Sequence, residues 1–159
     1  MEDRLVTAYL ALGSNLGDRS ALLDAAVNLL GERAGRVTAV SSPIETEPAG
    51  FQSPHPFLNQ ALALETTLAP SALLSVTQEI EKELGRSEKS EGGIYKDRPI
   101  DIDLILYGDL ALETPGLTLP HPRFRERPFV LRPLSEIAGD DVTDPVTGKT
   151  ISELLWAVS

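Results

Sequence analysis

The pattern of apolar and polar residues divides the chain into strand-like and helix-like segments. Four segments show the alternation, or the short bounded apolar run, that is typical of strands. They cover residues 5–12, 37–46, 58–68 and 100–107. Because proline lacks the N–H that a central strand needs, Pro43 indicates that the second segment lies at a sheet edge or contains a bulge.

Apolar residues at helical spacing predict helices between and after these strands. The predicted helices cover residues 18–32, 70–84 and about 123–137, followed by a short helix at the C-terminus. Pro70 suits the first turn of the second helix, Pro128 is expected to kink or restart the third, and Thr150 with Glu153 forms a capping box for the last. The order βαββαβ, followed by helices, predicts a single α+β domain over residues 1–159 with a ferredoxin-like antiparallel sheet.

Asp101 and Asp103 interrupt the apolar strand predicted over residues 100–107. Side chains two positions apart on a strand point to the same face, so the two carboxylates should lie side by side. Neighbouring buried carboxylates are costly without a compensating cation, and an all-oxygen pair suits Mg²⁺. The alternative is that this strand has one face open to water, as half-exposed strands do.

Composition narrows the range of partners. The 159-residue chain carries a net charge of −10, which argues against general binding to nucleic acid or to anionic membranes. It contains no apolar stretch of the ~18 residues that a membrane span needs, and its acidic N-terminus is unlike a signal peptide. Without cysteine it forms neither disulfides nor thiolate metal sites. We expect a cytoplasmic monomer that acts on small molecules.

The basic residues are concentrated in two segments. Eight of the 14 lysines and arginines lie within residues 86–98 and 121–132. On an acidic protein such clusters indicate a site for a small polyanion, although solvated loops paired with Glu91 and Glu126 would give the same pattern. Residues 47–57 and 86–98 are also long irregular connections, which are more often functional or disordered than structural. The second is expected to be open or poorly ordered without ligand and to close when its ligand binds.

Seven short motifs, taken in order, resemble one family. They cover residues 11–17 (ALGSNLG), 45–48 (ETEP), 57–59 (FLN), 80–86 (IEKELGR), 97–103 (DRPIDID), 119–123 (LPHPR) and 126–131 (ERPFVL). Each motif alone is weak. Their order and spacing together are specific, and over about residues 5–155 the chain resembles the 6-hydroxymethyl-7,8-dihydropterin pyrophosphokinases of folate biosynthesis.

The resemblance implies an enzyme that moves the β,γ-diphosphate of ATP, as one unit, onto the hydroxymethyl oxygen of a reduced pterin, leaving AMP. Such a transfer depends on positioning and charge neutralisation, which metal carboxylates and converging cations supply without a covalent nucleophile. By this resemblance, Asp101 and Asp103 would hold two Mg²⁺ ions that bridge the ATP phosphates. Arg86 and Arg98 would complete the catalytic set, with Arg98 stabilising the transferring group.

The same resemblance assigns residues to the two substrates. Those on the nucleotide side would be Gln78, Glu81, Arg98, Leu104, Thr118, His121 and Arg127. Those on the pterin side would be Gly13, Thr46, Glu47, Phe57, Asn59 and Phe129. His121 and Arg127 would contact phosphates, Phe57 and Phe129 would stack on the two faces of the pterin, and Thr46 and Asn59 would bind its amino-pyrimidine edge. Without the resemblance, Thr46 and Asn59 would be interpreted as residues that cap strand ends.

Residues 86–98 depart from the family pattern. After Arg86 the expected second arginine is missing, and Tyr95 replaces a tryptophan. Lys89 or Lys96 would supply a cation there, but an ammonium does not reproduce the bidentate guanidinium fork. The resemblance implies that residues 86–98 would close over Mg-ATP. It does not determine how they close or which lysine replaces the missing arginine.

Two other interpretations compete with this one. A nucleotidyltransferase also uses a Gly-Ser turn and an Asp-x-Asp strand, but there the two follow closely, whereas Ser14 and Asp101 lie 87 positions apart. The second alternative is a non-catalytic ferredoxin-like binding domain, because this fold hosts many functions. Such a domain has no need for a carboxylate pair between two basic segments.

Overall fold

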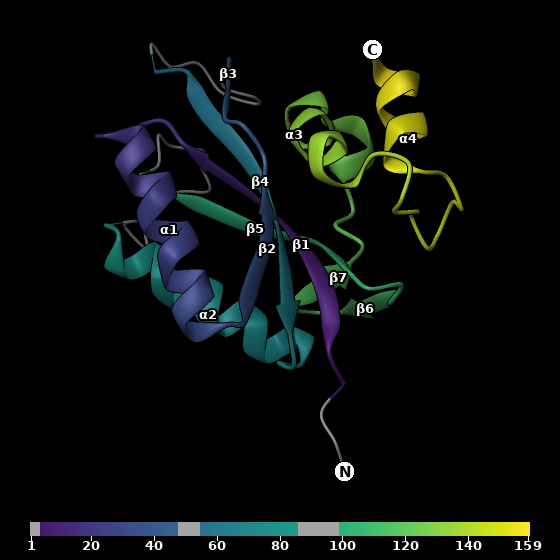
Figure 1. Ribbon diagram of the computed structural model, residues 1–159, viewed down its shortest axis with the longest axis horizontal. Helices are drawn as coiled ribbons and strands as arrows, with labels where there is room; N and C mark the ends of the chain where they lie inside the picture. The colour runs from purple at the N-terminus through teal and green to yellow at the C-terminus, as the bar shows by residue number, and fades with distance from the viewer. Residues whose placement is uncertain (1–3, 48–54, 86–98) are drawn as a thin grey trace.

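The structure is a computed structural model that describes residues 4–47, 55–85 and 99–159. Its centre is a five-stranded antiparallel sheet in the order β2-β4-β1-β5, with β3 paired along β4 (Figure 1). The strands are β1 (Val6–Ser14), β2 (Arg36–Val40), β3 (Ile44–Thr46), β4 (Phe57–Thr66) and β5 (Asp101–Tyr107). This order is the ferredoxin-like arrangement, and the predicted fold class is confirmed.

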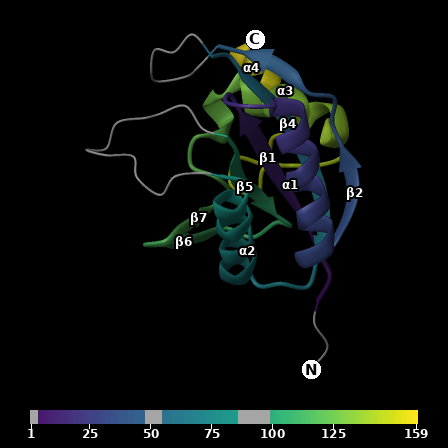
Figure 2. The same cartoon turned by 90° about the vertical axis from the view of Figure 1, so that its left-hand side faces the viewer.

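Helices cover both faces of the sheet. Helices α1 (Arg19–Arg33) and α2 (Pro70–Glu83) lie side by side on one face, as Figures 1 and 2 show. Helices α3 (Pro128–Ala138) and α4 (Ile151–Val158) lie on the other face. Strands β6 (Leu112–Thr114) and β7 (Leu117–Leu119) form a separate hairpin after β5. Helices thus cover both faces of the sheet, except at positions where the strands carry polar residues.

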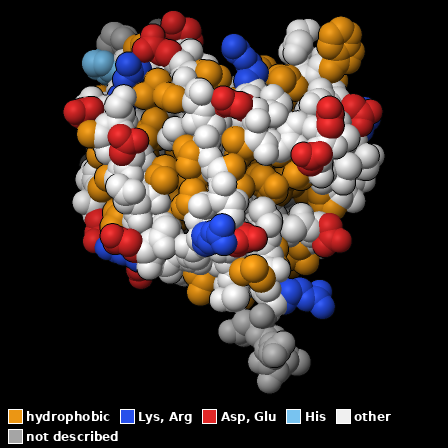
Figure 3. All heavy atoms as spheres, viewed as in Figure 1, with side chains coloured by type: hydrophobic (Ala, Val, Ile, Leu, Met, Phe, Trp, Pro, Cys, Tyr) orange, Lys and Arg blue, Asp and Glu red, His pale blue; other side chains and the backbone are white. Residues whose placement is uncertain are grey.

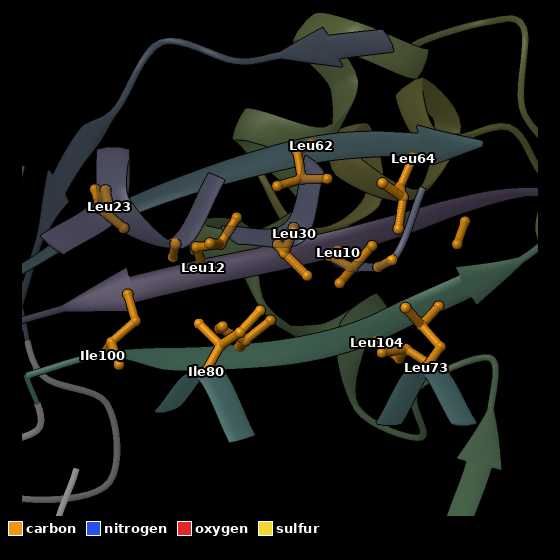
Figure 4. Close-up of a cluster of buried hydrophobic side chains, with 14 of the residues drawn as sticks. Leu10, Leu12, Leu23, Leu30, Leu62, Leu64, Leu73, Ile80, Ile100 and Leu104 are labelled. Carbon is orange, nitrogen blue, oxygen red and sulfur yellow. The ribbon is translucent and has the colours of Figure 1, made fainter. Parts of the chain in front are cut away.

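The larger hydrophobic cluster lies between the sheet and the pair α1 and α2. Figure 4 shows Leu10, Leu62 and Leu104 of the strands gathered with Leu30 of α1 and Leu73 of α2. Each of these side chains is nearly or wholly buried. Since full burial of a leucine contributes about 1.5–3 kcal/mol, this cluster fixes both helices on the sheet.

A second hydrophobic cluster holds α3 and α4 against the opposite face. It contains Leu106 of β5, Phe124, Leu131 of α3 and Leu154 of α4, all buried. The capping box predicted for α4 is present, because Thr150 Oγ1 accepts from the Glu153 N–H and Glu153 accepts from the Thr150 N–H. The cap and the apolar face together explain how an eight-residue helix is held.

Two predicted elements are interrupted in the structure. The predicted strand over 37–46 breaks between β2 and β3, where Ser42 donates through its N–H and Oγ to the carboxylate of Glu136 on α3. The predicted helix over 123–137 begins as a separate 3₁₀ turn, Phe124–Glu126, and α3 restarts at Pro128. Proline lacks an N–H, so it suits the first turn of a helix, where that donor would have no intrahelical partner.

Strand β5 also contains a bulge that the sequence did not predict. Leu104 pairs with Leu10 and Leu106 pairs with Tyr9, which leaves Ile105 as an extra residue. Leu104 consequently faces the α1 and α2 cluster, whereas Ile105 and Leu106 face the α3 and α4 cluster. The carbonyl oxygen of the extra residue, Ile105, accepts a hydrogen bond from the His121 N–H.

On the face of the molecule seen in Figure 3, hydrophobic side chains gather across the middle and acidic side chains lie around the rim. Large apolar residues that remain exposed include Trp156 on α4 and Val40 at the end of edge strand β2. Among the helices of the described residues, none has the length and apolar character to cross a membrane.

Candidate active site

The predicted metal carboxylates and part of the predicted pterin site share one face of the sheet. Gly13 of β1 is paired with Asn59 of β4 on one side and with Asp101 of β5 on the other. Directly opposite residues of antiparallel strands present their side chains to the same face. With adjacent Cα atoms about 5 Å apart, Asn59 and Asp101 stand about 10 Å apart across a glycine.

This face changes character along its length. At one end, Leu106 belongs to the hydrophobic cluster under α3 and α4. At the other end the same face presents Asn59, Asp101 and Asp103, and Asp103 is paired with Ala11. Both aspartates are half-buried, while Ile102 between them is buried on the opposite face. The aspartate strand therefore has one core face and one partly open face, and the carboxylates occupy the open one.

Glu81 anchors the strand that carries the aspartates. This glutamate on α2 is 7% exposed, and its Oε2 accepts a hydrogen bond of 2.8 Å from the N–H of Ile102. Ile102 lies between Asp101 and Asp103, at the outer edge of the sheet. The carboxylate thus satisfies a buried edge-strand donor and fixes the backbone on which both aspartates stand. Sequence reasoning assigned Glu81 to the nucleotide, and nothing in the local pattern indicated this contact.

His121 is held beside the site by the β5 bulge. The carbonyl oxygen of Ile105 accepts from the His121 N–H at 2.9 Å. The imidazole Nδ1 accepts from the Arg123 N–H at 3.1 Å, which assigns the proton of the neutral ring to Nε2. Burial lowers the pKa of His121, the charge of Arg127 lowers it further, and Asp101 opposes both. The lowered pKa favours the neutral imidazole, which can donate through Nε2, and the charges of Asp101 and Arg127 both act on this ring.

The pterin-side residues of β3, β4 and β1 lie together. Thr46 is paired with Phe57, and Asn59 donates through Nδ2 to Thr46 Oγ1. A Cβ placed on Gly13 would lie 3.1 Å from Asn59 Oδ1 and 3.4 Å from Cδ1 of Phe57. Gly13 therefore leaves a space that the Phe57 ring and the Asn59 amide border.

The structure also describes four further residues predicted on the nucleotide side. Arg127 precedes α3, and its guanidinium carbon is 5.7 Å from the ring centroid of Phe129. Thr118 is half-buried on β7, and Gln78 is exposed on α2. Leu104 is 4% exposed, so its side chain belongs to the core.

Of the three remaining predicted site residues, the structure describes only Glu47. Glu47 follows β3 directly and is exposed. Arg86 and Arg98 lie outside the described residues, as does the segment 86–98 that was predicted to close over Mg-ATP. Their roles stay predictions.

The donor set fits a hard divalent cation that also binds substrate. Within residues 4–47, 55–85 and 99–159, no group of three or more acidic or histidine side chains converges on one point. Asp101 and Asp103 present carboxylates from alternate positions of one strand. Mg²⁺ commonly takes one or two carboxylates and completes its shell with waters and phosphates. A carboxylate pair is therefore sufficient when ATP supplies the remaining oxygens.

The chain was compared with protein families and with individual proteins. Residues 9–139 match the family model described as "7,8-dihydro-6-hydroxymethylpterin-pyrophosphokinase (HPPK)". A 2-amino-4-hydroxy-6-hydroxymethyldihydropteridine pyrophosphokinase of Porphyromonas gingivalis is 53% identical over 135 residues, covering 84% of this chain and 92% of that protein. The Bacillus subtilis protein of the same name is 44% identical over 147 residues, covering 92% and 86%.

Solved structures support the fold independently. The chain superposes on an HPPK-DHPS crystal structure, determined in complex with substrates, with a TM-score of 0.75 at 14% identity, covering 97% of this chain. A Plasmodium falciparum HPPK-DHPS structure with pteroate gives a TM-score of 0.76 at 16% identity, covering 99% of this chain. The chain spans 43% of the length of each of these solved chains.

Proposed function

Because the chain belongs to the 7,8-dihydro-6-hydroxymethylpterin-pyrophosphokinase family, we propose that its sheet-face site transfers the β,γ-diphosphate of ATP to the hydroxymethyl oxygen of 6-hydroxymethyl-7,8-dihydropterin. The enzyme is a diphosphotransferase of folate synthesis that binds ATP and this pterin. In the reaction the hydroxymethyl oxygen bonds to the β-phosphorus and loses its proton to solvent. The bond from that phosphorus to the α,β-bridging oxygen breaks, and AMP leaves with the bridging oxygen.

The observation that carries this proposal is the cross-strand row of Asn59, Gly13 and Asp101. A flat bicycle whose amino-pyrimidine edge meets Asn59 and Thr46 would lie over Gly13 and extend toward Asp101. A separation of about 10 Å between the two ends of the row suits a ring system whose reacting substituent is opposite its recognised edge. This placement brings the acceptor hydroxyl toward the carboxylates rather than away from them.

Asp101 and Asp103 are the residues that would hold two Mg²⁺ ions, and these would neutralise charge on the triphosphate and orient it. His121 would donate its Nε2–H to a phosphate oxygen, because its Nδ1 is already occupied by the Arg123 N–H. Arg127 would add a second donor and a positive charge beside it. Phe57 and Phe129 would hold the pterin by stacking.

An assay that identifies both products tests the proposal. With ATP, Mg²⁺ and 6-hydroxymethyl-7,8-dihydropterin, we expect one AMP and one pterin diphosphate per turnover, resolved by chromatography. Formation of ADP and a pterin monophosphate would contradict transfer of the diphosphate as one unit. Omission of Mg²⁺ with excess chelator should abolish turnover and restored Mg²⁺ should recover it.

We further propose that the enzyme acts as a monomer in the cytoplasm. The absence of cysteine suits a reducing compartment, and the residues assigned to both substrates come from one chain. Sedimentation of the purified enzyme and fractionation of expressing cells test the two statements separately.

A further inference from the structure

Arg19, the first residue of α1, joins two segments on the pterin side of the site. Its Nη1 donates to the carbonyl oxygen of Pro56 at 2.9 Å, and its Nη2 donates to Glu45 Oε2 at 2.9 Å. A guanidinium holds its donors in one rigid plane, so two occupied donors fix the spacing of their acceptors. Arg19 therefore ties β3 to the residue that leads into β4.

Each of these two acceptors adjoins a pterin-side residue. Glu45 precedes Thr46, Pro56 precedes Phe57, and Thr46 and Phe57 are paired in the sheet. Successive side chains of a strand alternate between faces, so Glu45 points toward α1 while Thr46 points toward the site. Arg19 thus holds the two segments from behind, on the face opposite the one that receives substrate.

A second contact from the turn before α1 acts on the same segment. Asn15 is 2% exposed, and its Nδ2 donates to the carbonyl oxygen of His55 at 3.1 Å. Two consecutive carbonyl groups, those of His55 and Pro56, are therefore bound by side chains next to α1. The backbone entering Phe57 is set by α1 as well as by its own strand.

We propose that Arg19 is a positioning residue for the dihydropterin. By joining Glu45 to Pro56 it sets the spacing between Thr46 and Phe57, two residues that line the proposed pterin site. This inference rests on the proposed pterin site. An ion pair in which Arg19 is 30% exposed and Glu45 57% exposed contributes little to folding. Loss of Arg19 should accordingly change substrate affinity more than stability.

Arg19→Met tests the role, and Arg33→Met is its matched control. Arg33 lies at the other end of α1, binds Glu83 through two N–H groups, and has a similar side-chain exposure of 34%. For both variants we would measure the Kd of 6-hydroxymethyl-7,8-dihydropterin with saturating Mg²⁺ and α,β-methylene-ATP, in which the bond to be broken is blocked. Values of KM and kcat with ATP, and the thermal midpoint, complete the comparison.

Arg19→Met should raise the dihydropterin Kd and KM about tenfold, equivalent to about 1.4 kcal/mol, with ATP-analogue affinity and thermal midpoint close to those of Arg33→Met. Arg19→Lys, which keeps the charge but not the planar fork, should recover only part of the affinity, and it decides the question if Arg19→Met does not fold. Unchanged dihydropterin affinity, or an equal loss for the ATP analogue, would overturn the positioning role. An unmodified enzyme that binds no dihydropterin would instead contradict the proposed function.

Discussion

Asn59 and Asp101 lie on either side of Gly13, in one row across three antiparallel strands, and their side chains point to the same face of the sheet. The two residues are 42 positions apart in sequence, and one is assigned to the pterin edge while the other is assigned to metal. The sheet brings them to about 10 Å. Under the proposed function, strand register would couple pterin recognition to phosphate chemistry, and a change in register would separate the two residues.

Replacement of either aspartate should remove activity without unfolding the enzyme. Asp101→Ala or Asp103→Ala loses charge neutralisation on the triphosphate but relieves repulsion between two neighbouring carboxylates. We expect turnover in saturating Mg²⁺ to fall by about 10²–10³-fold, by analogy with the loss of other groups that stabilise transition-state charge. Circular dichroism and unfolding midpoints should match those of Asp109→Ala, an exposed control just after β5. A variant that turns over at the normal rate would remove the residue from the metal site.

Glu81 should affect both stability and turnover through Ile102. Glu81→Leu leaves the buried Ile102 N–H without this acceptor, which should lower the free energy of unfolding by about 1–3 kcal/mol. Glu81→Gln keeps an oxygen acceptor, so its stability should lie closer to that of the unmodified enzyme. Urea unfolding of both variants, with exposed Glu79→Leu from the same helix as control, measures the difference. Equal stability of the Leu and Gln variants would show that the contact is not what holds β5.

The strands and helices were largely predictable because their signals are local. A compact apolar run marked β1, and alternation marked β4 and β5. Asp18, Pro70 and Thr150 marked helix starts. Pro43 was the only local sequence signal of the break between β2 and β3. Its other causes are long-range: Ala61 N–H donates to Ser41 Oγ, and Ser42 binds Glu136. No local pattern encodes contacts with residues so distant in sequence.

The Arg125–Asp144 pair should make part of the stability depend on acid pH. Asp144 is fully buried; burial raises its pKa, but hydrogen bonds from Arg125, Thr147 and the Val146 N–H outweigh this and bring it to about 2. A carboxyl with a pKa lower in the folded than in the unfolded state stabilises the fold above its unfolded value of 3.8. That contribution is lost as the pH falls from about 4 to about 2.

Asp144→Asn should therefore be less stable than the unmodified enzyme at pH 6 by about 2 kcal/mol, and the gap should narrow as the pH falls from about 4 to about 2. Urea unfolding between pH 6 and pH 2.5 measures this gap. Asp140→Asn, an exposed position shortly before, serves as control and should show no such convergence. A gap that stays constant with pH would mean that ionisation of Asp144 contributes nothing.

The two phenylalanines should contribute to pterin affinity and little to ATP affinity. Aromatic stacking is worth about 0.5–1.5 kcal/mol beyond area burial, so Phe57→Ala and Phe129→Ala should each raise the dihydropterin Kd at least several-fold. Trp156→Ala, at a side chain that is 82% exposed on α4, is the control. Titration with the ATP analogue should give the same Kd for all three variants. If only one phenylalanine matters, the pterin is stacked on a single face.

The site was less predictable than the fold. Through the resemblance, the motifs predicted site roles for Asp101, Asp103, Asn59 and Thr46. That these residues lie on one face of the sheet depends on strand pairing between distant segments of the chain. The placement of His121 depends on the bulge at Ile105, whose residue type gives no sign of an extra position. Arg19 was hidden because an arginine at the start of a helix is ordinary on a protein surface. Its partners, Glu45 and Pro56, are brought close to each other only by the pairing of β3 with β4.

Gly13→Ala should test the space at the centre of the row directly. Gly13 has no positive φ, so alanine fits its backbone, but the added Cβ would lie 3.1 Å from Asn59 Oδ1 and 3.4 Å from the Phe57 ring. The Asn59 amide must shift by a few tenths of an ångström, whereas the Phe57 ring is at ordinary contact distance. The methyl group occupies the space assigned to the pterin. Gly116→Ala is the matched control, because nothing lies within 4 Å of its added Cβ. We expect the dihydropterin Kd to rise about tenfold or more for Gly13→Ala, an effect of about 1.4 kcal/mol, with the affinity for the ATP analogue retained. Normal dihydropterin affinity in Gly13→Ala would mean that the pterin does not lie between Asn59 and Asp101, and that the shared row is structural rather than functional.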